Sequence, residues 1–318
     1  MTEPVPTVAA GGSLTVMIAL GANLLVAIAK TFASVITGSA SMVAETAHSW
    51  ADFGNEIFLL IADRRSMKQR DDRHPLGFGR EAYVWSMFAA FGIFTAGAVV
   101  SIWHGIQQLL APEDAANFGI AYIVLAVAFV LEGTSFAQAF RQARVGGKRR
   151  GTSTGFYALT SSNATLRAVF AEDAAALIGL AMAFLGILLH QLTGLAAFDA
   201  VGSILVGMLL GVVAIVLIDR NRRFLIGEIP DDGLRNDVLS GLLEHSEIER
   251  VTYLHLEFVG PGKVFLVASV DIVGDETETH VAYSLRRIED SLRQNEHIEE
   301  ALLSLSTPDE PSLLPVVE

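Results

Sequence analysis

The stretch SASMVAETAHSWADFGNEIFLLIA, residues 39–62, decides the fold because it sets ionisable side chains in an apolar background. It is long enough to cross a bilayer as a helix. Four polar residues within it recur at spacings of three, four and three, which puts them on one helical stripe: Glu45, His48, Asp52 and Asn55. Ionisable groups inside a membrane are costly and usually mark a pathway or a site. We therefore predict a membrane-spanning helix with one functional polar face.

The rest of the chain is also unusually apolar. Its 318 residues are 52% hydrophobic and only 18% charged, with a mean hydropathy of +0.46, whereas soluble domains carry about 25% charged residues. Apolar runs of roughly 20 residues mark spanning helices. We predict six of them, at about residues 14–36, 41–61, 83–109, 118–140, 167–189 and 198–217.

The Lys and Arg residues of the connecting loops predict the orientation of these spans. The loop after the second span carries Arg64, Arg65, Lys68, Arg70, Arg73 and Arg80. The loop after the fourth span carries Arg141, Arg144, Lys148, Arg149 and Arg150. The three other connections contain neither residue type. Because loops rich in Lys and Arg stay inside, we expect both termini on the cytoplasmic side.

A water-soluble part is expected after the last span. We predict helices over 232–243 and 277–292, and strands over 251–258, 264–270 and 301–306, with a turn at Gly260-Pro261-Gly262. The order αββαβ indicates a small two-layer α+β domain. The net charge of −13 lies mainly in this part and argues against nucleic-acid binding.

The polar stripe is also a candidate metal site. The chain has no cysteine, so a transition metal must be bound by His, Asp, Glu or backbone oxygen. His48 and Asp52 lie one turn apart and can hold one ion, with ligand types that suit Zn²⁺, Mn²⁺ or Fe²⁺. In the fifth span Glu172 and Asp173 point about 100° apart. Asp173 could complete the site, while Glu172 pairs with Arg167 or lies near the aqueous edge.

A purely structural interpretation stands beside this one. The stripe could consist of satisfied polar side chains between packed helices, although two acids among four residues argue against it. For Glu132 in the fourth span and Asp199 in the sixth, a packing or helix-end role is the preferred interpretation. Asn23 in the first span is expected to form a hydrogen bond between helices.

With these residues placed, the chain resembles the cation diffusion facilitator family of metal/proton antiporters. Residues 39–52 look like that family's second span with its HxxxD motif, and HPLGFGR at 74–80 is similar to its entry into span three. LIGE at 225–228 resembles the junction to its C-terminal domain. AETAHSWAD at 44–52 and EDAAA at 172–176 look closer to the sub-branch that includes the mitochondrial zinc exporter of animals.

The resemblance implies a transport site made by two residues of span two and two of span five. The first pair carries over onto His48 and Asp52, and one span-five ligand onto Asp173. The remaining position is Val169, which cannot bind a metal. The resemblance leaves Glu172, Glu45 or water as the replacement, and Glu172 is preferred.

Two further family sites are incomplete in this chain. A loop site after span two would use Asp71, but Phe78 stands at its second ligand position. Asp72 and His74 would at best bind a metal poorly. In the C-terminal domain His255 falls near a family ligand, while His245, His280 and His297 are scattered. The resemblance implies dimerisation as the role of that domain.

Together these features predict an α-helical membrane protein with six transmembrane helices followed by a small cytoplasmic ferredoxin-like α+β domain. We divide it into a cytoplasmic N-terminal tail without a signal peptide (1–12), a six-helix transport domain (13–227), an αββαβ domain (228–306) and a flexible tail (307–318).

The function implied by the resemblance is efflux of a divalent metal, Zn²⁺ first, in exchange for protons. The metal is the cargo and no cofactor is expected. A homodimer in a bacterial inner membrane is the expected setting. The alternatives are an exporter of Mn²⁺, Fe²⁺ or Co²⁺ and a non-transporting metal sensor or scaffold. An enzyme is not predicted, because neither an HExxH nor a GxSxG pattern is recognised in the chain.

Overall fold

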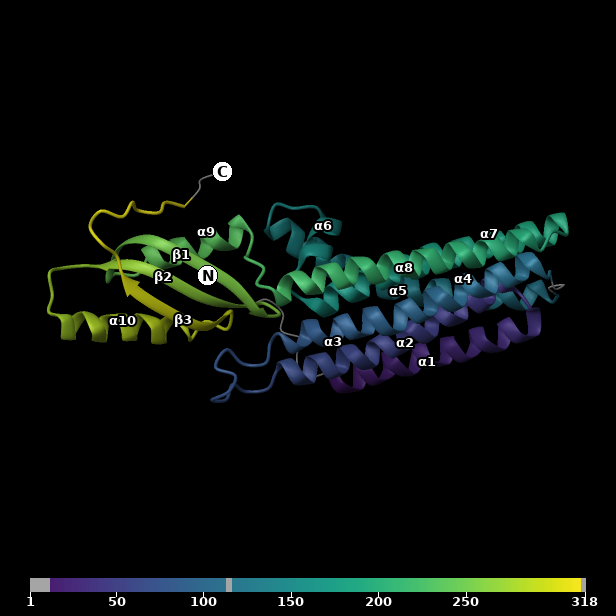
Figure 1. Cartoon of the computed structure of the whole chain (residues 1–318), viewed down its shortest axis with the longest axis horizontal. Coiled ribbons are helices and arrows are strands. Elements are labelled where there is room, and N and C mark those ends of the chain that lie inside the picture. Colours follow the sequence, from purple (N-terminus) through teal and green to yellow (C-terminus); the bar gives the residue numbers. More distant parts are fainter. Residues whose placement is uncertain (1–11, 113–115, 316–318) are drawn as a thin grey trace. The chain divides into compact units, whose positions relative to one another are not determined.

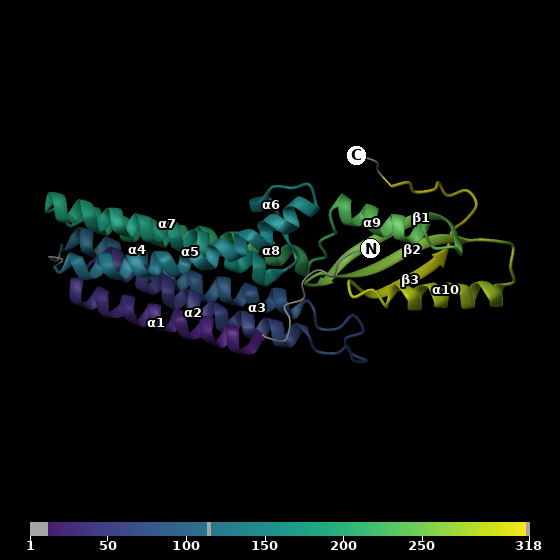
Figure 2. The ribbon, with the colours of Figure 1, turned by 180° about the vertical axis from the view of Figure 1, so that it is seen from behind.

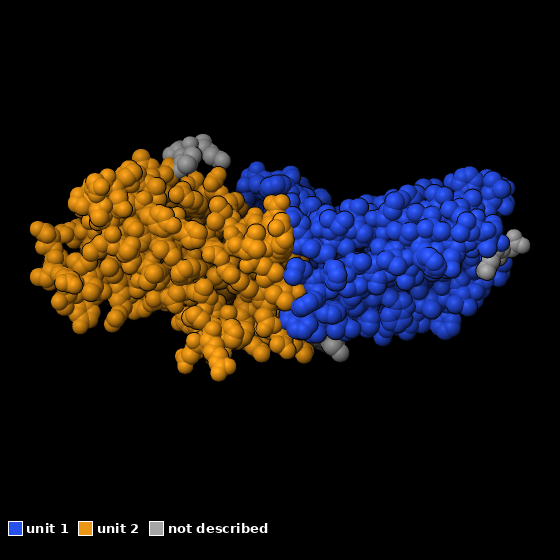
Figure 3. All heavy atoms as spheres, in the orientation of Figure 1, with its two compact units in different colours: residues 1–61, 85–161, 165–220 blue, residues 62–84, 162–164, 221–318 orange. Residues whose placement is uncertain are grey.

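The computed structural model describes residues 12–112 and 116–315, with the side chains given from residue 20 onward. The predicted N-terminal tail lies outside the described residues except for Gly12. The chain forms two compact units (Figure 3). Residues 1–61, 85–161 and 165–220 form the first, called here the membrane unit, and residues 62–84, 162–164 and 221–318 form the second, the C-terminal unit.

Long helices running side by side make up the membrane unit (Figures 1 and 2). Several of them continue at one end into the C-terminal unit. In chain order the helices are α1 (Gly12–Thr37), α2 (Ala40–Ser66), α3 (Glu81–Ala89), the π-helical turn η1 (Ala90–Phe94), α4 (Thr95–Leu110), α5 (Phe118–Arg149), α6 (Thr154–Thr160), α7 (Ala164–Thr193) and α8 (Ala197–Leu225).

Within the described residues, five helical segments are long and apolar enough to cross a membrane: α1, the α3–η1–α4 segment, α5, α7 and α8. The 27-residue α2 is long enough but too polar, because it carries the stripe predicted from the sequence. A helix with buried charges can span only when its polar face is covered by other helices. The predicted fold class is confirmed, with α2 as the helix that its polar residues set apart.

The structure differs most from the predicted spans at the third and the fourth. The third span is broken by the π turn η1, for which no sequence signal was recognised. The fourth span continues through Arg149, so Arg141, Arg144 and Lys148 are helical where a loop was expected. The extra turns lie against α6, since a Cβ on Gly146 would come within 2.2 Å of the Tyr157 ring. Glycine at that position permits the close approach.

The N-terminus of α2 is capped by a carboxylate of α8, a helix far away in the sequence. Asp199 is fully buried and accepts hydrogen bonds from the Ser39 hydroxyl (2.9 Å) and from the backbone N–H groups of Ala40 (2.7 Å) and Ser41 (3.1 Å). The first N–H groups of a helix have no partner within it, and an anion there is stabilised by the helix dipole. Asp199 therefore has the helix-end role preferred from the sequence.

The C-terminal unit contains the expected αββαβ order: α9 (Asp232–Leu243), β1 (Ile248–Gly260), β2 (Lys263–Ile272), α10 (Glu278–Leu292) and β3 (Ile298–Leu305). The sheet has the order β1-β2-β3, with β1 and β2 antiparallel and β2 and β3 parallel. Leu239 and Leu242 of α9 and Ile288 of α10 pack in one apolar core with the strands.

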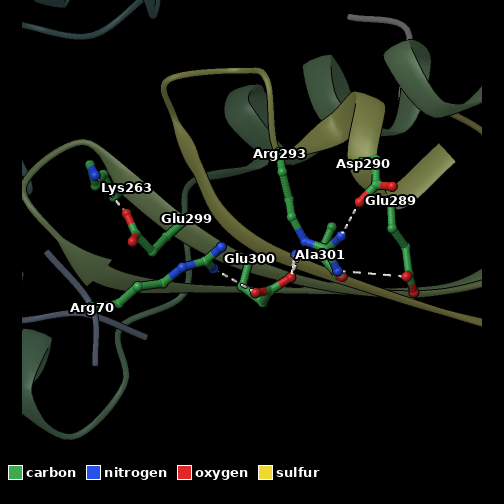
Figure 4. A network of polar contacts seen from close by, with 8 residues as sticks. All are labelled: Arg70, Lys263, Glu289, Asp290, Arg293, Glu299, Glu300 and Ala301. Carbon is green, nitrogen blue, oxygen red and sulfur yellow. Dashed lines mark hydrogen bonds and ion pairs between the residues drawn. The ribbon is translucent and has the colours of Figure 1, made fainter. Parts of the chain in front are cut away.

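Charged side chains join the parts of the C-terminal unit (Figure 4). Glu300 of β3 accepts hydrogen bonds from Arg293, which follows α10, and from Arg70 of the loop after α2 at 2.8 Å. Arg293 also pairs with Asp290 at 2.7 Å and with Glu289 at 3.6 Å. We call Arg70, Arg293, Glu300, Asp290 and Glu289 the Arg293 network.

The chain after Ser306 follows β1 through the last described residue, Pro315. The Leu313 N–H donates to the Val251 carbonyl at 2.7 Å, and Arg250 donates to the Glu310 carbonyl at 2.7 Å. The sequence predicted a flexible tail here. The described part of the segment supplies hydrogen-bond partners to the exposed edge of β1, and its flexibility stays a prediction. The predicted domain boundary at 227–228 stays a prediction, since neither compact unit is contiguous in sequence.

Candidate metal site

The four stripe residues of α2 are all buried within the membrane unit. Glu45, His48 and Asn55 expose at most 1% of their surface, and Asp52 exposes 9%. Three- and four-residue spacings bring these side chains to one face of the helix. The sequence therefore located correctly a polar face that is shielded from lipid by other helices.

The stripe contains several atoms that make no hydrogen bond. Both ring nitrogens of His48, Oδ1 of Asp52 and Oε1 of Glu45 are buried without a hydrogen-bond partner. His48 Nε2 lies 3.4 Å from Asp52 Oδ1, which is too long for a well-formed bond. Buried polar atoms are normally satisfied, and leaving one unpaired costs about 1–3 kcal/mol. The structural interpretation of a satisfied stripe is therefore not supported at these atoms, which are free to bind a ligand.

Helix α7 contributes the facing carboxylates. Glu172 is buried and accepts a hydrogen bond from Asn55 Nδ2 at 2.6 Å, which joins α7 to the stripe directly. Asp173 is buried and accepts from the Ser135 hydroxyl of α5 at 2.7 Å. It also interacts electrostatically with Asp52. Both acids of the predicted site thus lie in the same interior region as the stripe.

The suggested pairing of Glu172 with Arg167 is replaced by the bond to Asn55. Arg167 is fully buried and donates to the backbone carbonyl of Ser161. A guanidinium near the beginning of α7 satisfies a carbonyl of the preceding segment, and the Glu172 carboxylate is bound across the helix interface instead. The preferred replacement ligand is therefore already held beside α2.

The site also contains charged residues that the sequence analysis missed. Lys30 of α1 is buried and lies 2.9 Å from Glu45, which makes a buried ion pair. Glu132 of α5 interacts electrostatically with Lys30, Asp52 and Asp173, so its packing interpretation is incomplete. Lys30 was detectable, because a lysine inside an apolar span follows the same rule that identified the stripe.

One further acid lies one turn beyond Asp52. Glu56 accepts a hydrogen bond from Asn23 Nδ2 at 2.9 Å, which confirms the predicted interhelical role of Asn23. The second oxygen of Glu56 is buried without a hydrogen-bond partner. Carboxylates therefore continue along α2 past the four-residue stripe. A spacing of four residues from Asp52 was the signal that could have revealed it.

Outside the membrane unit the candidate ligands are more exposed. Asp71 accepts from the His74 ring nitrogen at 2.8 Å, and about half of each side chain is exposed. The hydrogen bond from His74 holds the pKa of the Asp71 carboxyl below its usual value. His74 also contacts the Phe78 ring, with centroids 4.3 Å apart. This loop pair is satisfied by itself, and the Phe78 ring occupies the neighbouring position.

The described residues contain no group of three or more His, Asp or Glu side chains close enough to hold one metal ion. This applies to the C-terminal histidines His245, His255, His280 and His297 and to the membrane site alike. In the membrane unit, however, the unpaired ligand atoms of α2 and the hydrogen-bonded carboxylates of α7 lie in the same interior region, and a small movement of α7 against α2 would change their separation. The set of imidazole and carboxylate donors suits a borderline divalent cation.

A GxSxG pattern at residues 151–155 escaped the sequence analysis. In the structure the Ser153 hydroxyl accepts from the Phe156 N–H at 3.4 Å, at the beginning of α6. A catalytic serine in this pattern follows a strand at a sharp turn. Here the serine caps a short helix between α5 and α7, so the pattern has a structural explanation.

A bundle of membrane-spanning helices with imidazole and carboxylate groups in its interior is typical of membrane proteins that bind or move cations. The chain belongs to the cation efflux family: residues 16–226 match the cation efflux transmembrane domain. The resemblance to the cation diffusion facilitator family is thereby confirmed.

Individual relatives agree with this assignment. The chain is 36% identical over 256 residues to metal tolerance protein C4 of Arabidopsis thaliana. The aligned residues make up 80% of this chain and 56% of the relative. The chain is 37% identical over 267 residues to the mitochondrial proton-coupled zinc antiporter SLC30A9 of Xenopus laevis, covering 83% and 47%. The cation-efflux pump FieF of Escherichia coli is 33% identical over 110 residues. The chain spans about half the length of the first two relatives.

Proposed function

We propose that this chain exports Zn²⁺ from the cytoplasm in exchange for protons, with His48, Asp52 and Asp173 as ligands and Glu172 as the fourth. The observation that carries the proposal is the set of buried, unpaired ligand atoms on α2 opposite the carboxylates of α7. The printed activity of the SLC30A9 relative as a proton-coupled zinc antiporter supports the choice of cargo.

Exchange with protons follows from the ligand types. Imidazole and carboxylate must be deprotonated to bind a metal, so protons and metal compete for the same atoms. In an alternating-access cycle, metal binds from the cytoplasmic side, the helices rock, and protons displace the metal on the far side. To bring all four ligands onto one metal ion, Glu172 and Asp173 need only approach the stripe. Both lie on one helix, α7, which already contacts α2 through the bond between Glu172 and Asn55.

One observation favours a different metal as the transported ion. Six carboxylates interact electrostatically within the site region, together with the imidazole of His48: Glu45, Asp52, Glu56, Glu132, Glu172 and Asp173. Oxygen-rich sites suit Mn²⁺ and Fe²⁺ better than nitrogen-rich ones. Export of Mn²⁺, Fe²⁺ or Co²⁺ is therefore the second candidate. The proposed setting for either is a homodimer in a bacterial inner membrane, with both termini cytoplasmic.

The test is metal uptake into proteoliposomes under an imposed pH gradient. Wild type is compared with His48→Ala, Asp52→Ala and Asp173→Ala, and with Asp290→Ala as a matched control for loss of a carboxylate in the C-terminal unit. We expect gradient-dependent Zn²⁺ flux in wild type and the control and none in the three site variants. Competition by Mn²⁺ or Fe²⁺ establishes selectivity. No flux of any divalent metal through folded, inserted wild type would contradict the proposal and favour a sensor or scaffold.

A further inference from the structure

The ammonium of Lys30 is buried in the membrane unit, and its direct partner among the described residues is Glu45. The ammonium lies 2.9 Å from Glu45 Oε2, and both residues expose at most 1% of their surface. Taking two charges out of water costs several kcal/mol per ion, and a buried pair is often no more stable than an apolar one. Stability alone is therefore a weak explanation for this pair. Ionisable residues inside membrane spans usually have a functional role.

The other carboxylate oxygen of Glu45, Oε1, lies on the side of the candidate metal site. This oxygen has no hydrogen-bond partner, and neither has Nδ1 of His48 one turn further along α2. Both atoms face Gly179 of α7: a Cβ there would lie 2.8 Å from Glu45 Oε1 and 3.6 Å from His48 Nδ1. The absence of a side chain at residue 179 leaves these two atoms beside each other. Glu45 thus lies between the ammonium on one side and the metal-ligand stripe on the other.

The charge of Lys30 also reaches the proposed ligands. Lys30 interacts electrostatically with His48, Asp52 and Glu132 besides Glu45. A positive charge near a carboxylate repels a divalent cation that binds there, and this repulsion is strong where water is excluded. The ammonium and the metal cannot both bind Glu45 at full strength. Glu132 offers the ammonium a second carboxylate within electrostatic range.

We propose that Lys30 is a specificity-determining residue that competes with the metal for the Glu45 carboxylate. The inference rests on the proposed function. Lys30 holds Glu45 away from the ligand set and lowers the affinity of the site, and a cation must carry enough charge to displace it. When a divalent metal binds, the ammonium moves from Glu45 toward Glu132, and Glu45 becomes available to the metal. Lys30 thereby disfavours monovalent cations and keeps binding weak enough for release.

The test measures Zn²⁺ binding to the purified full chain in detergent by calorimetric titration. Lys30→Met removes the competitor and frees Glu45, so we expect at least about tenfold tighter binding than in wild type. Glu45→Gln leaves the ammonium unpaired beside the site, so binding should weaken by about tenfold. Lys30→Arg is the matched control: it keeps the charge, and affinity should stay within about threefold.

A purely structural ion pair gives a different result. Lys30→Met and Glu45→Gln would then both lower the melting temperature and leave the Zn²⁺ affinity of the folded protein unchanged, which would overturn the inference. If Lys30→Met does not fold, Lys30→Gln, which also removes the charge, decides: tighter binding supports competition, and unchanged binding contradicts it. Absence of binding in folded wild type would instead count against the proposed function.

Discussion

The α2 stripe and the Arg293 network are both clusters of ionisable side chains, but they differ in burial and in whether their polar atoms have partners. In the stripe, ligand atoms are buried and lack hydrogen-bond partners, as at both nitrogens of His48. In the network, Arg293 is about a quarter exposed and bonds to three carboxylates. Satisfied, partly exposed charges hold strand and helix together. Unsatisfied buried polar atoms lower stability, and where they cluster with perturbed ionisable groups they point to a functional site.

The largest effect is expected for Asp199→Ala, which tests whether a hydrogen-bonded polar group in the membrane unit stabilises the fold. Asp199→Ala removes the acceptor for three hydrogen bonds at the beginning of α2. Unpaired buried donors cost about 1–3 kcal/mol each, so we expect a loss of about 3–5 kcal/mol in unfolding free energy. Thermal unfolding in detergent measures it. A melting temperature equal to that of wild type would break the comparison, because Asp199 would then resemble the stripe.

The next effect has the opposite sign. His48→Leu removes two buried nitrogens without hydrogen-bond partners and fills the same region with apolar atoms. Relief of about 1–3 kcal/mol of desolvation cost should raise the melting temperature, while metal flux is lost. Such a gain in stability with loss of function is typical of active sites. His104→Leu, which replaces another histidine with an unpartnered nitrogen in the membrane unit, is the comparison variant. A lower melting temperature for His48→Leu would indicate a structural histidine.

A smaller loss in unfolding free energy is expected when the Arg293 network of the C-terminal unit is broken. Arg293→Ala removes the common partner of Glu289, Asp290 and Glu300. Partly exposed ion pairs contribute little singly, and a network somewhat more, so we expect a loss of about 1–2 kcal/mol. Arg286→Ala, which replaces an arginine of the preceding helix α10 outside this network, is the matched control. Flux per inserted molecule should not change. A loss of flux with normal stability would show that the network also serves transport.

The smallest effect depends on pH. Burial alone would raise the pKa of Glu300, but hydrogen bonds from Arg293 and the Ala301 N–H, together with the charges of Arg293 and Arg70, lower it below its usual 4.5. A lowered carboxyl pKa contributes stability that is fully present above the unfolded value and is lost as pH falls through the folded one. Glu300→Gln should therefore cost about 0.5–1 kcal/mol at pH 7. Its difference from wild type should shrink as the pH falls below 4.5 and vanish once the pH is below the lowered folded pKa. A difference that persists in acid would mean that shape, not charge, stabilises this pair.

Sequence alone determined the helical membrane class, the αββαβ order and the polar face of α2. These depend on short-range patterns: about 20 apolar residues for a span, a 3.6-residue period for a stripe, and a glycine turn between two strands. The same patterns placed α9 at 232–243, where the structure has it. They also singled out His48, Asp52, Glu172 and Asp173, which the structure shows to be buried.

Only the tertiary structure decided which polar atoms have partners. Asn55 with Glu172, Ser135 with Asp173 and Lys30 with Glu45 join residues 117, 38 and 15 positions apart, and their partners depend on how helices are packed. No local pattern encodes that choice, since any of several carboxylates in the bundle could accept the same donor. The packing of α1, α5 and α7 around α2 leaves His48 without a hydrogen bond and pairs Glu45 with a lysine.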